Sequence, residues 1–343
     1  SLPIGHNHPK MRAGDFRATL MRAAASNPTN SDVYTREFGA FVQTFREIAA
    51  PKEFPHLFFV AGGALGVENA LKVAFDWKRQ KNCATGVDGG GDKVLHFREA
   101  FHGRSGYTLS LTNTGSVKTD NFPQFSWPRI SNPKAHFPID EEETAAAEAA
   151  SVAEIEQAFD ADPNGIAAII IEPIQGEGGD NHFRPEFLKQ LRRIADTREA
   201  MLIFDEVQTG IGLTGSMWAF QQLGVTPDIV AFGKKTQVCG IMSTDRVDDV
   251  DTNVFHVSSR INSTWGGNLV DMVRVARYLQ IIEEDSLVEN AAQSGELFLS
   301  ELLAMQERFA SVTNARGRGL MLAFDLPDGA VRDQLRARCW DLG

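Results

Sequence analysis

Short apolar runs alternate with helix-spaced segments through the middle of the chain. The runs lie at His56–Val60, Lys93–Phe97, Ile166–Ile171, Met201–Phe204 and Asp228–Phe232. Each run is almost continuously apolar, which is typical of parallel strands that are covered on both faces. The segments after Gly66 and Pro185 place their apolar residues along one helix face. This alternation predicts an α/β fold with a mostly parallel sheet sandwiched by helices.

The alternation stops near residue 266. Residues 268–308 read as mostly helical, and Gly317–Leu326 reads as a strand after a turn. We therefore expect two domains. The large domain covers residues 20–265, and a smaller α+β domain combines residues 266–343 with residues 1–19.

The ends of the sequence suggest that it is a piece of a longer protein. The chain opens at Ser1 without a methionine and stops at Gly343 within a helical pattern. We accordingly expect the C-terminal part of the small domain to be truncated.

Composition narrows the kinds of partner. The 343 residues carry a formal net charge of -11, which argues against a broad nucleic-acid-binding surface. The chain has no apolar run of the roughly 18 residues that a membrane span requires, and no visible signal peptide. Its cysteines, Cys83, Cys239 and Cys339, have neither CxxC nor metal-ligand spacing. We expect a cytoplasmic protein with no disulfide framework and no metal site.

Candidate chemistry follows the apolar runs, because ligand-binding groups gather at the carboxyl ends of strands in open α/β sheets. After the first run, Gly62, Gly63 and Ala64 precede a helix. Backbone N–H groups and the helix dipole suit a phosphate at such a place, although a plain tight turn has the same sequence.

Two further runs lead into residues that suit a flat, anionic ligand. Phe101 can stack on a ring, or pack in the core, and Arg104 can grip a carboxylate or form a surface ion pair. Glu177 lies among three glycines, which suggests a backbone that approaches a ligand closely. A loop with a solvated acid is the alternative.

The last two runs end in charged residues. Asp205 follows a buried run, and a carboxylate there needs a cation such as a pyridinium nitrogen, although a helix cap or a metal would also explain it. Lys234 and Lys235 follow the final run, and a covalent Schiff base is one reason for a lysine there. Composition does not choose between these two lysines.

The conjunction of these features is more specific than any one of them. A phosphate cup, a stacking aromatic, a buried acid and a lysine on successive strand ends are the contacts that pyridoxal phosphate requires. The segments IIIEPIQGEGG, LIFDEVQTGIGLTG and PDIVAFGK then make the chain resemble, over almost its whole length, the class III aminotransferases of the fold-type I pyridoxal-phosphate superfamily. The segments AGGALGVENALKVAFDWK, GKKTQVCG, GEGGDNHFRPEF and SRINSTWGGN are similar to those of the L-lysine 6-aminotransferases (lysine ε-aminotransferases).

The resemblance implies how the cofactor is held. Lys234 matches the Schiff-base lysine, Asp205 matches the partner of the pyridine nitrogen, and Gln208 matches the residue near the phenolic oxygen. Phe101, with His102 beside it, matches the ring-stacking position. The resemblance therefore implies that Lys234, and not Lys235, is the reactive lysine.

The resemblance also implies a phosphate site shared between subunits. Gly62, Gly63 and Ala64 match the phosphate cup. Thr264 matches a residue that reaches the phosphate from the other subunit, so we expect a homodimer with shared active sites.

Three residues are implied on the substrate side, and one more lies in a family-like motif. Glu177 resembles the acid that reorganises between two substrates, and its arginine partner in related enzymes lies nearer the C-terminus. Arg104 and Asn262 match substrate contacts, and His182 lies in a family-like motif.

The expected reaction moves the terminal amino group of L-lysine to 2-oxoglutarate, giving 2-aminoadipate 6-semialdehyde and glutamate. Two alternatives stay open. The first is another class III ω-aminotransferase, acting on ornithine, acetylornithine or 4-aminobutyrate, because a fold does not determine a substrate. The second is a noncatalytic α/β binding protein, although the GxGxxG pattern of a dinucleotide fold is absent after the first run.

Overall fold

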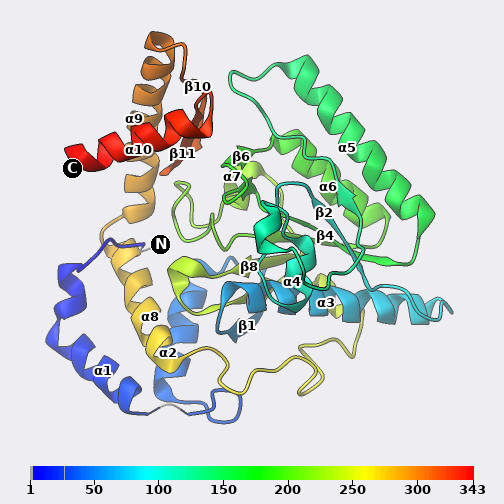
Figure 1. Ribbon diagram of the computed structural model, residues 1–343. Coiled ribbons are helices and arrows are strands. Elements are labelled where there is room, and N and C mark those ends of the chain that lie inside the picture. Colours follow the sequence, from blue (N-terminus) through cyan, green and yellow to red (C-terminus); the bar gives the residue numbers. More distant parts are fainter. Residues whose placement is uncertain (1–2, 27) are drawn as a thin grey trace.

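The computed structural model describes residues 3–26 and 28–343, and its centre is a seven-stranded sheet (Figure 1). The strand order is β1-β9-β8-β7-β4-β2-β3. The strands are β1 (His56–Val60), β2 (Lys93–Phe97), β3 (Arg129–Ile130), β4 (Ile166–Ile171), β7 (Met201–Asp205), β8 (Ile229–Phe232) and β9 (Cys239–Ser243). β9 runs antiparallel to both of its neighbours, and every other pair in the sheet is parallel. The predicted mostly parallel sheet is confirmed.

Helices cover both faces of this sheet (Figure 1). The helices among the described residues are α1 (Gly14–Ala25), α2 (Arg36–Thr44), α3 (Gly63–Ala84), α4 (Gly106–Leu111), α5 (Glu141–Ala161), α6 (Pro185–Thr197), α7 (Phe220–Leu223), α8 (Leu269–Glu284), α9 (Leu287–Arg308) and α10 (Gly329–Leu342). Short 3-10 turns lie at Pro9–Arg12, Ser116–Lys118, Lys234–Thr236 and Asp245–Asp249, and one π turn lies at Phe45–Ala49.

Two hydrophobic cores form because successive side chains of a strand point to opposite faces. In β4, Ile169 and Ile171 enter the core that contains α2, α5, α6 and α8. Ala168 and Ile170 enter the second core, together with the buried face of α3. The nearly continuous apolar character of the strands is therefore the consequence of burial on both faces.

Helix α6 shows why the amphipathic pattern after Pro185 correctly predicted a helix. Pro185 occupies the first turn, where its fixed φ suits a helix and its missing N–H is not needed. All the apolar positions expected along one face are buried, namely Phe187, Leu188, Leu191, Ile194 and Ala195. Each large side chain of this kind contributes about 1.5–3 kcal/mol when it leaves water.

The segment Gly317–Leu326 does not form one strand, so that prediction was wrong. It contains the end of β10 (Thr313–Arg318), a turn, and β11 (Met321–Asp325), which pair as an antiparallel hairpin. Gly319 makes the turn with a φ of 52°, and a Cβ there would lie 2.4 Å from the backbone of Thr214. The turn is thus enforced by packing against a segment that is distant in the sequence.

The proposed division into domains stays a prediction. Helix α1 runs through the expected boundary at residues 19 and 20, and it packs against α8 (Figure 1). Helices α9 and α10 and the β10–β11 hairpin lie together at one end of the molecule (Figure 1). Residues 1 and 2 of the expected small domain, and residue 27 of the large one, lie outside the described residues.

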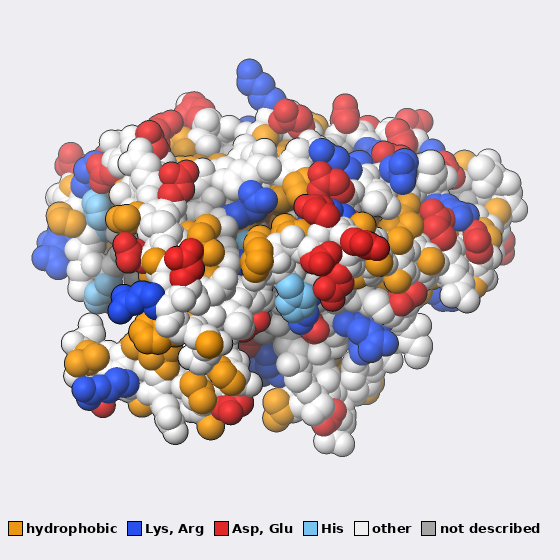
Figure 2. Space-filling view, turned by 90° about the horizontal axis from the view of Figure 1, so that it is seen from above, with side chains coloured by type: hydrophobic (Ala, Val, Ile, Leu, Met, Phe, Trp, Pro, Cys, Tyr) orange, Lys and Arg blue, Asp and Glu red, His pale blue; other side chains and the backbone are white. Residues whose placement is uncertain are grey.

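Surface and composition agree with a moderately acidic protein. Acidic and basic side chains are interspersed over the face seen in Figure 2. Within the described part of the chain, no helix combines the length and the apolar character that crossing a membrane takes. The three cysteines are free, and the described residues contain no group of three or more candidate metal ligands.

Candidate active site

The carboxyl ends of β1, β2, β4, β7 and β8 open into one cavity of about 440 Å³. We call it the strand-end cavity. It is lined by Gly63, Ala64, Phe101, His102, Gly103, Arg104, Glu172, Glu177, Asp205, Val207, Gln208, Lys234, Gln237 and Cys239. These residues are far apart in the sequence and meet because the strands that carry them run in the same direction.

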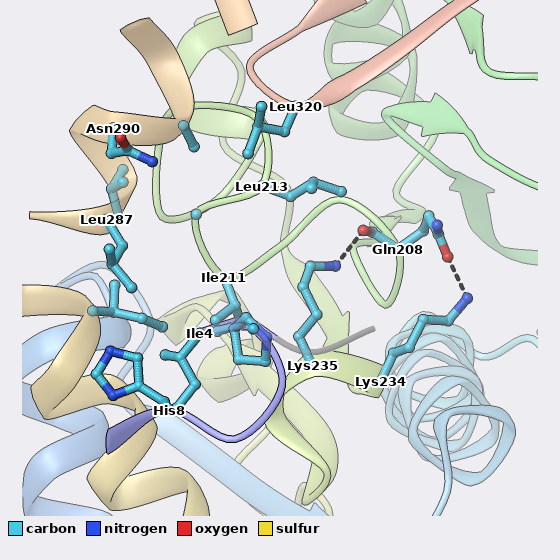
Figure 3. A pocket seen from close by; sticks show the side chains of 16 residues that line it. Ile4, His8, Gln208, Ile211, Leu213, Lys234, Lys235, Leu287, Asn290 and Leu320 are labelled. Carbon is cyan, nitrogen blue, oxygen red and sulfur yellow. Dashed lines mark hydrogen bonds between the residues drawn. The ribbon is translucent and has the colours of Figure 1, made fainter. Parts of the chain in front are cut away.

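The structure separates the two lysines that follow β8. Lys234 has a left-handed φ of 54°, an uncommon conformation for a residue with a side chain, and its Nζ donates to Gln208 Oε1 in the strand-end cavity. Lys235 is 5% exposed, and its Nζ donates to the backbone carbonyl of Gln208. Figure 3 shows both amines bonded to Gln208. Only Lys234, of these two, shares the cavity with Asp205.

A second cavity, of about 390 Å³, is lined by Gln208, Lys234 and Lys235 among others (Figure 3). Apolar side chains such as Ile4, Ile211 and Leu287 form much of its wall. Burial, and then the charge of Lys234, lowers the pKa of Lys235 to about 8. Lys235 thus lines the second cavity and does not line the strand-end cavity.

Asp205 is the last residue of β7 and is 4% exposed. Its Oδ2 lies 2.8 Å from Nδ1 of His102, whose side chain is fully buried. Its Oδ1 accepts the backbone N–H of Val207 at 3.1 Å. A buried carboxylate without polar partners would be very costly, and these two contacts supply such partners to Asp205.

Glu172 is a second buried acid in the cavity, and sequence reasoning missed it. It follows β4 and accepts the backbone N–H groups of Phe101 at 2.9 Å and of Gly176 at 3.2 Å. Burial raises the pKa of Glu172 to about 7, although nearby His102 acts against this rise. The signal was the same one that singled out Asp205, an acid directly after a fully apolar run.

The start of α3 forms a cup on the cavity wall. Gly62 precedes the helix with a φ of 103° and supplies no capping side chain. The first N–H groups of a helix have no partner within it, so this end of α3 suits an anion. A Cβ on Gly103 would lie 2.6 Å from the Cβ of Ala64, which shows how closely the loop after β2 approaches the cup.

Three predicted residues lie along the rest of the cavity wall: Phe101, Arg104 and Glu177. Glu177 Oε1 lies 2.6 Å from Nζ of Lys118, a residue that the sequence did not suggest. This hydrogen bond is the main reason why the pKa of Glu177 is lowered, against a smaller effect of burial. The charges of Lys234 and Arg104 lower it further.

Four other predicted residues do not line the strand-end cavity: Gly62, which lies directly before α3, Thr264, Asn262 and His182. Thr264 and Asn262 are exposed. The backbone carbonyl of Thr264 accepts from Ser31 Oγ at 3.0 Å, and Asn262 Oδ1 accepts from the next backbone N–H. His182 is buried in the small β5–β6 hairpin (Ile174–Gln175 and Asn181–His182), where burial lowers its pKa to about 3.

The arrangement suits pyridoxal phosphate. One cavity holds an amine on Lys234, a buried carboxylate on Asp205, an aromatic ring on Phe101 and a helix start that suits an anion. These groups match the aldehyde, the ring nitrogen, the ring face and the phosphate of that cofactor. Gly62 and Gly63 leave the cup free of side chains.

Comparisons with known proteins identify the family. The model of the class III aminotransferases matches residues 1–343. The L-lysine-epsilon aminotransferase of Mycobacterium tuberculosis is 54% identical over 343 residues, which are 99% of this chain and 76% of that protein. The one from Streptomyces clavuligerus is 50% identical over 339 residues, 98% of this chain and 74% of that protein. The chain belongs to the class III aminotransferases.

Solved structures agree with this assignment. A lysine aminotransferase from M. tuberculosis in the internal aldimine form superposes with a TM-score of 0.97 at 54% identity, covering 99% of this chain and 79% of that one. Human mitochondrial 4-aminobutyrate aminotransferase is a more distant relative, 30% identical over 370 residues, with 98% of this chain and 70% of that protein covered. The predicted enzyme class, fold type and cofactor, pyridoxal phosphate, are confirmed.

Proposed function

We propose that this enzyme transfers the terminal amino group of L-lysine to 2-oxoglutarate, giving 2-aminoadipate 6-semialdehyde and glutamate. The observation that carries the proposal is the contrast among relatives. L-lysine-epsilon aminotransferases are 50–54% identical to the chain, whereas the 4-aminobutyrate aminotransferases are 30–31% identical over a similar share of it. The noncatalytic alternative is not favoured, because Asp205 and Lys234 face one cavity in a chain of an enzyme family.

Bound pyridoxal phosphate supplies the electron sink that accepts the electrons of the broken C–H bond. Lys234 is the residue that we assign to proton transfer. Its Nζ would hold the aldehyde of the cofactor, and as a free amine it would move a proton at the carbon that bears the substrate amine. The hydrogen bond to Gln208 Oε1 orients this nitrogen in the cavity.

Asp205 is the residue that we assign to the ring nitrogen of the cofactor. Its carboxylate would accept a hydrogen bond from the protonated ring nitrogen, and the contact with His102 orients the carboxylate. We assign His102 to this positioning task and Phe101 to stacking on the ring. Gly62, Gly63 and Ala64 are assigned to the phosphate.

Glu177 and Arg104 are assigned to substrate choice. 2-Oxoglutarate carries two carboxylates, whereas lysine presents an ammonium group at its reacting end. A carboxylate and a guanidinium on one cavity wall can favour each substrate in turn if the carboxylate changes partner. Replacing Glu177 by alanine should change the ratio of the kcat/KM values for the two substrates, and an unchanged ratio would rule out this role.

We further propose a homodimer in which Thr264 of one subunit reaches the phosphate of the other. Exposed apolar side chains support this, among them Leu65 in the first turn of α3 and Trp265 beside Thr264, at 40% and 51% exposure. Light scattering should give a dimer, and Thr264→Ala should weaken cofactor binding in it. A fully active monomer would overturn the proposal.

Three free cysteines favour a reducing compartment, so we place the enzyme in the cytoplasm.

The substrate is tested with the cofactor as its own reporter. L-Lysine is added to the holoenzyme without an acceptor, and the visible absorption of the cofactor is followed. We expect lysine to convert the cofactor to its amine form faster than ornithine, acetylornithine or 4-aminobutyrate does. A faster response to one of those amines would replace lysine as the donor. An α-keto product from lysine would exclude transfer of the terminal amine.

A further inference from the structure

Lys118 stands behind the wall of the strand-end cavity and contacts two residues of that wall. Its Nζ lies 2.6 Å from Glu177 Oε1 and 5.2 Å from the centre of the Phe101 ring. A third contact, to Thr114 Oγ1 at 2.7 Å, fixes the same nitrogen from behind. The Lys118 side chain is only 17% exposed, so this is not a freely moving surface lysine.

The backbone around Lys118 is tied to the end of β2. Lys118 closes a 3-10 turn whose first residue is Ser116. Upstream, the backbone N–H of Asn113 donates to the carbonyl of Ala100 at 2.8 Å, and Asn113 Oδ1 accepts from Glu99 N–H at 2.6 Å. These bonds place the ammonium group before any substrate arrives, which reduces the entropy lost in holding Glu177.

The ion pair changes the charge that a substrate meets. An unpaired Glu177 carboxylate would repel the two negative charges of 2-oxoglutarate and attract the positively charged lysine. It would also compete with a substrate carboxylate for Arg104, whose charge already acts on Glu177. When the acceptor binds, a Glu177 carboxylate that stays on Lys118 does not compete for Arg104 and leaves its guanidinium for the substrate.

We infer that Lys118 is a positioning residue that holds the Glu177 carboxylate against the cavity wall and so sets the preference between the amino donor and the dicarboxylate acceptor. The inference rests on the proposed role of Glu177 in substrate choice. Lys118 acts through Glu177, and we assign it no contact with either substrate.

The test measures the two half-reactions separately on full-length holoenzyme. The pyridoxal form is mixed with L-lysine, the pyridoxamine form is mixed with 2-oxoglutarate, and the cofactor absorption gives kcat/KM for each. Lys118→Gln should lower the value for 2-oxoglutarate about tenfold and change the value for lysine about twofold or less. Lys118→Arg keeps the charge and should restore most of the lost rate. Added salt should shrink the defect, because it screens the exposed carboxylate.

A double-mutant cycle with Glu177→Gln separates positioning from a general charge effect. In the Glu177→Gln background, Lys118→Gln should no longer change the ratio of the two half-reactions. Equal effects in both backgrounds would overturn the inference, and so would equal slowing of both half-reactions together with a fall in Tm. Lys93→Gln is the matched control, because Lys93 forms a 2.7 Å pair with Asp162 outside the strand-end cavity. In Lys93→Gln, the ratio of the kcat/KM values for the two half-reactions should equal that of the wild type.

The inference about Lys118 and the proposal that lysine is the amino donor can fail independently. The reaction of the pyridoxamine form with 2-oxoglutarate involves no amino donor. If the wild type ignored lysine but accepted another amine, the proposed function would fail while the effect of Lys118 on the acceptor could still be measured. If the wild type used lysine and Lys118→Gln left the acceptor reaction unchanged, only the inference about Lys118 would fail.

Discussion

Replacing Glu172 by glutamine should make the stability of the protein less dependent on pH. Glu172 is 4% exposed, and this burial raises its pKa from the usual 4.5 to about 7. The folded state therefore keeps a proton that the unfolded state loses first. Below about pH 4.5 both states are protonated and there is no penalty, and the penalty grows as the pH rises towards 7. The difference between 7 and 4.5, at about 1.4 kcal/mol for each pH unit, gives roughly 3 kcal/mol above pH 7.

Glutamine does not ionise, so it avoids this pH-dependent loss of stability, but it destabilises the fold in another way. Glu172 accepts two backbone N–H groups through two oxygens, and glutamine offers only one oxygen. One N–H then faces an amide N–H₂, which costs about 1–3 kcal/mol at every pH. The variant should therefore be less stable than the wild type in mild acid and should approach or exceed it above neutrality.

The assay is urea unfolding of the cofactor-free protein at about pH 5.5 and about pH 8.5. We expect the free-energy difference between wild type and Glu172→Gln to change by about 2 kcal/mol in favour of the variant. Glu154→Gln is the control, because the bond to Ser131 lowers the pKa of Glu154 below both conditions. Its difference from the wild type should stay constant. A constant difference for Glu172→Gln as well would refute the reasoning about the buried acid.

Further predictions concern the cofactor. Lys234→Ala should abolish the visible absorption band of the covalently held cofactor and lower kcat by at least about 10³-fold. Lys235→Ala should keep this band but lower the free energy of unfolding, measured in urea. His102→Phe removes the partner of Asp205, so it should lower kcat about 10–100-fold and shift the cofactor band, while an unchanged band would contradict the positioning role. Gly103→Ala should weaken cofactor binding, measured by dialysis against a titration of the cofactor, because its Cβ would meet Ala64 and its φ of 126° is strained for a side chain.

Local patterns predicted the parts of the fold that local chemistry controls. The apolar runs at His56–Val60, Lys93–Phe97 and Ile166–Ile171 coincide with strands β1, β2 and β4, because strands buried on both faces must be apolar throughout. Strand β9 was missed. Its sequence, CGIMS, starts with a cysteine and a glycine, and its place next to the edge strand depends on pairing with β1 and β8.

Gly240 shows why no local rule would have found β9. A Cβ at this position would lie 2.1 Å from the carbonyl oxygen of Phe58 in β1. The glycine is thus required by close packing against another strand, a constraint that is absent from the neighbouring residues. The β10–β11 turn at Gly319 has the same origin, because its backbone approaches Thr214.

By itself, the sequence determined the strand-end residues that could serve a cofactor, because an acid such as Asp205 and a lysine directly after apolar runs are recognisable without a structure. Only the tertiary structure decided which groups meet. It brings His102 to Asp205 across 103 positions and Lys118 to Glu177 across 59. It also places Lys234 in the wall of the strand-end cavity and leaves Lys235 out of that wall. The physical reason is that such contacts depend on the order and direction of paired strands, which are set by long-range hydrogen bonding and burial rather than by neighbouring residues.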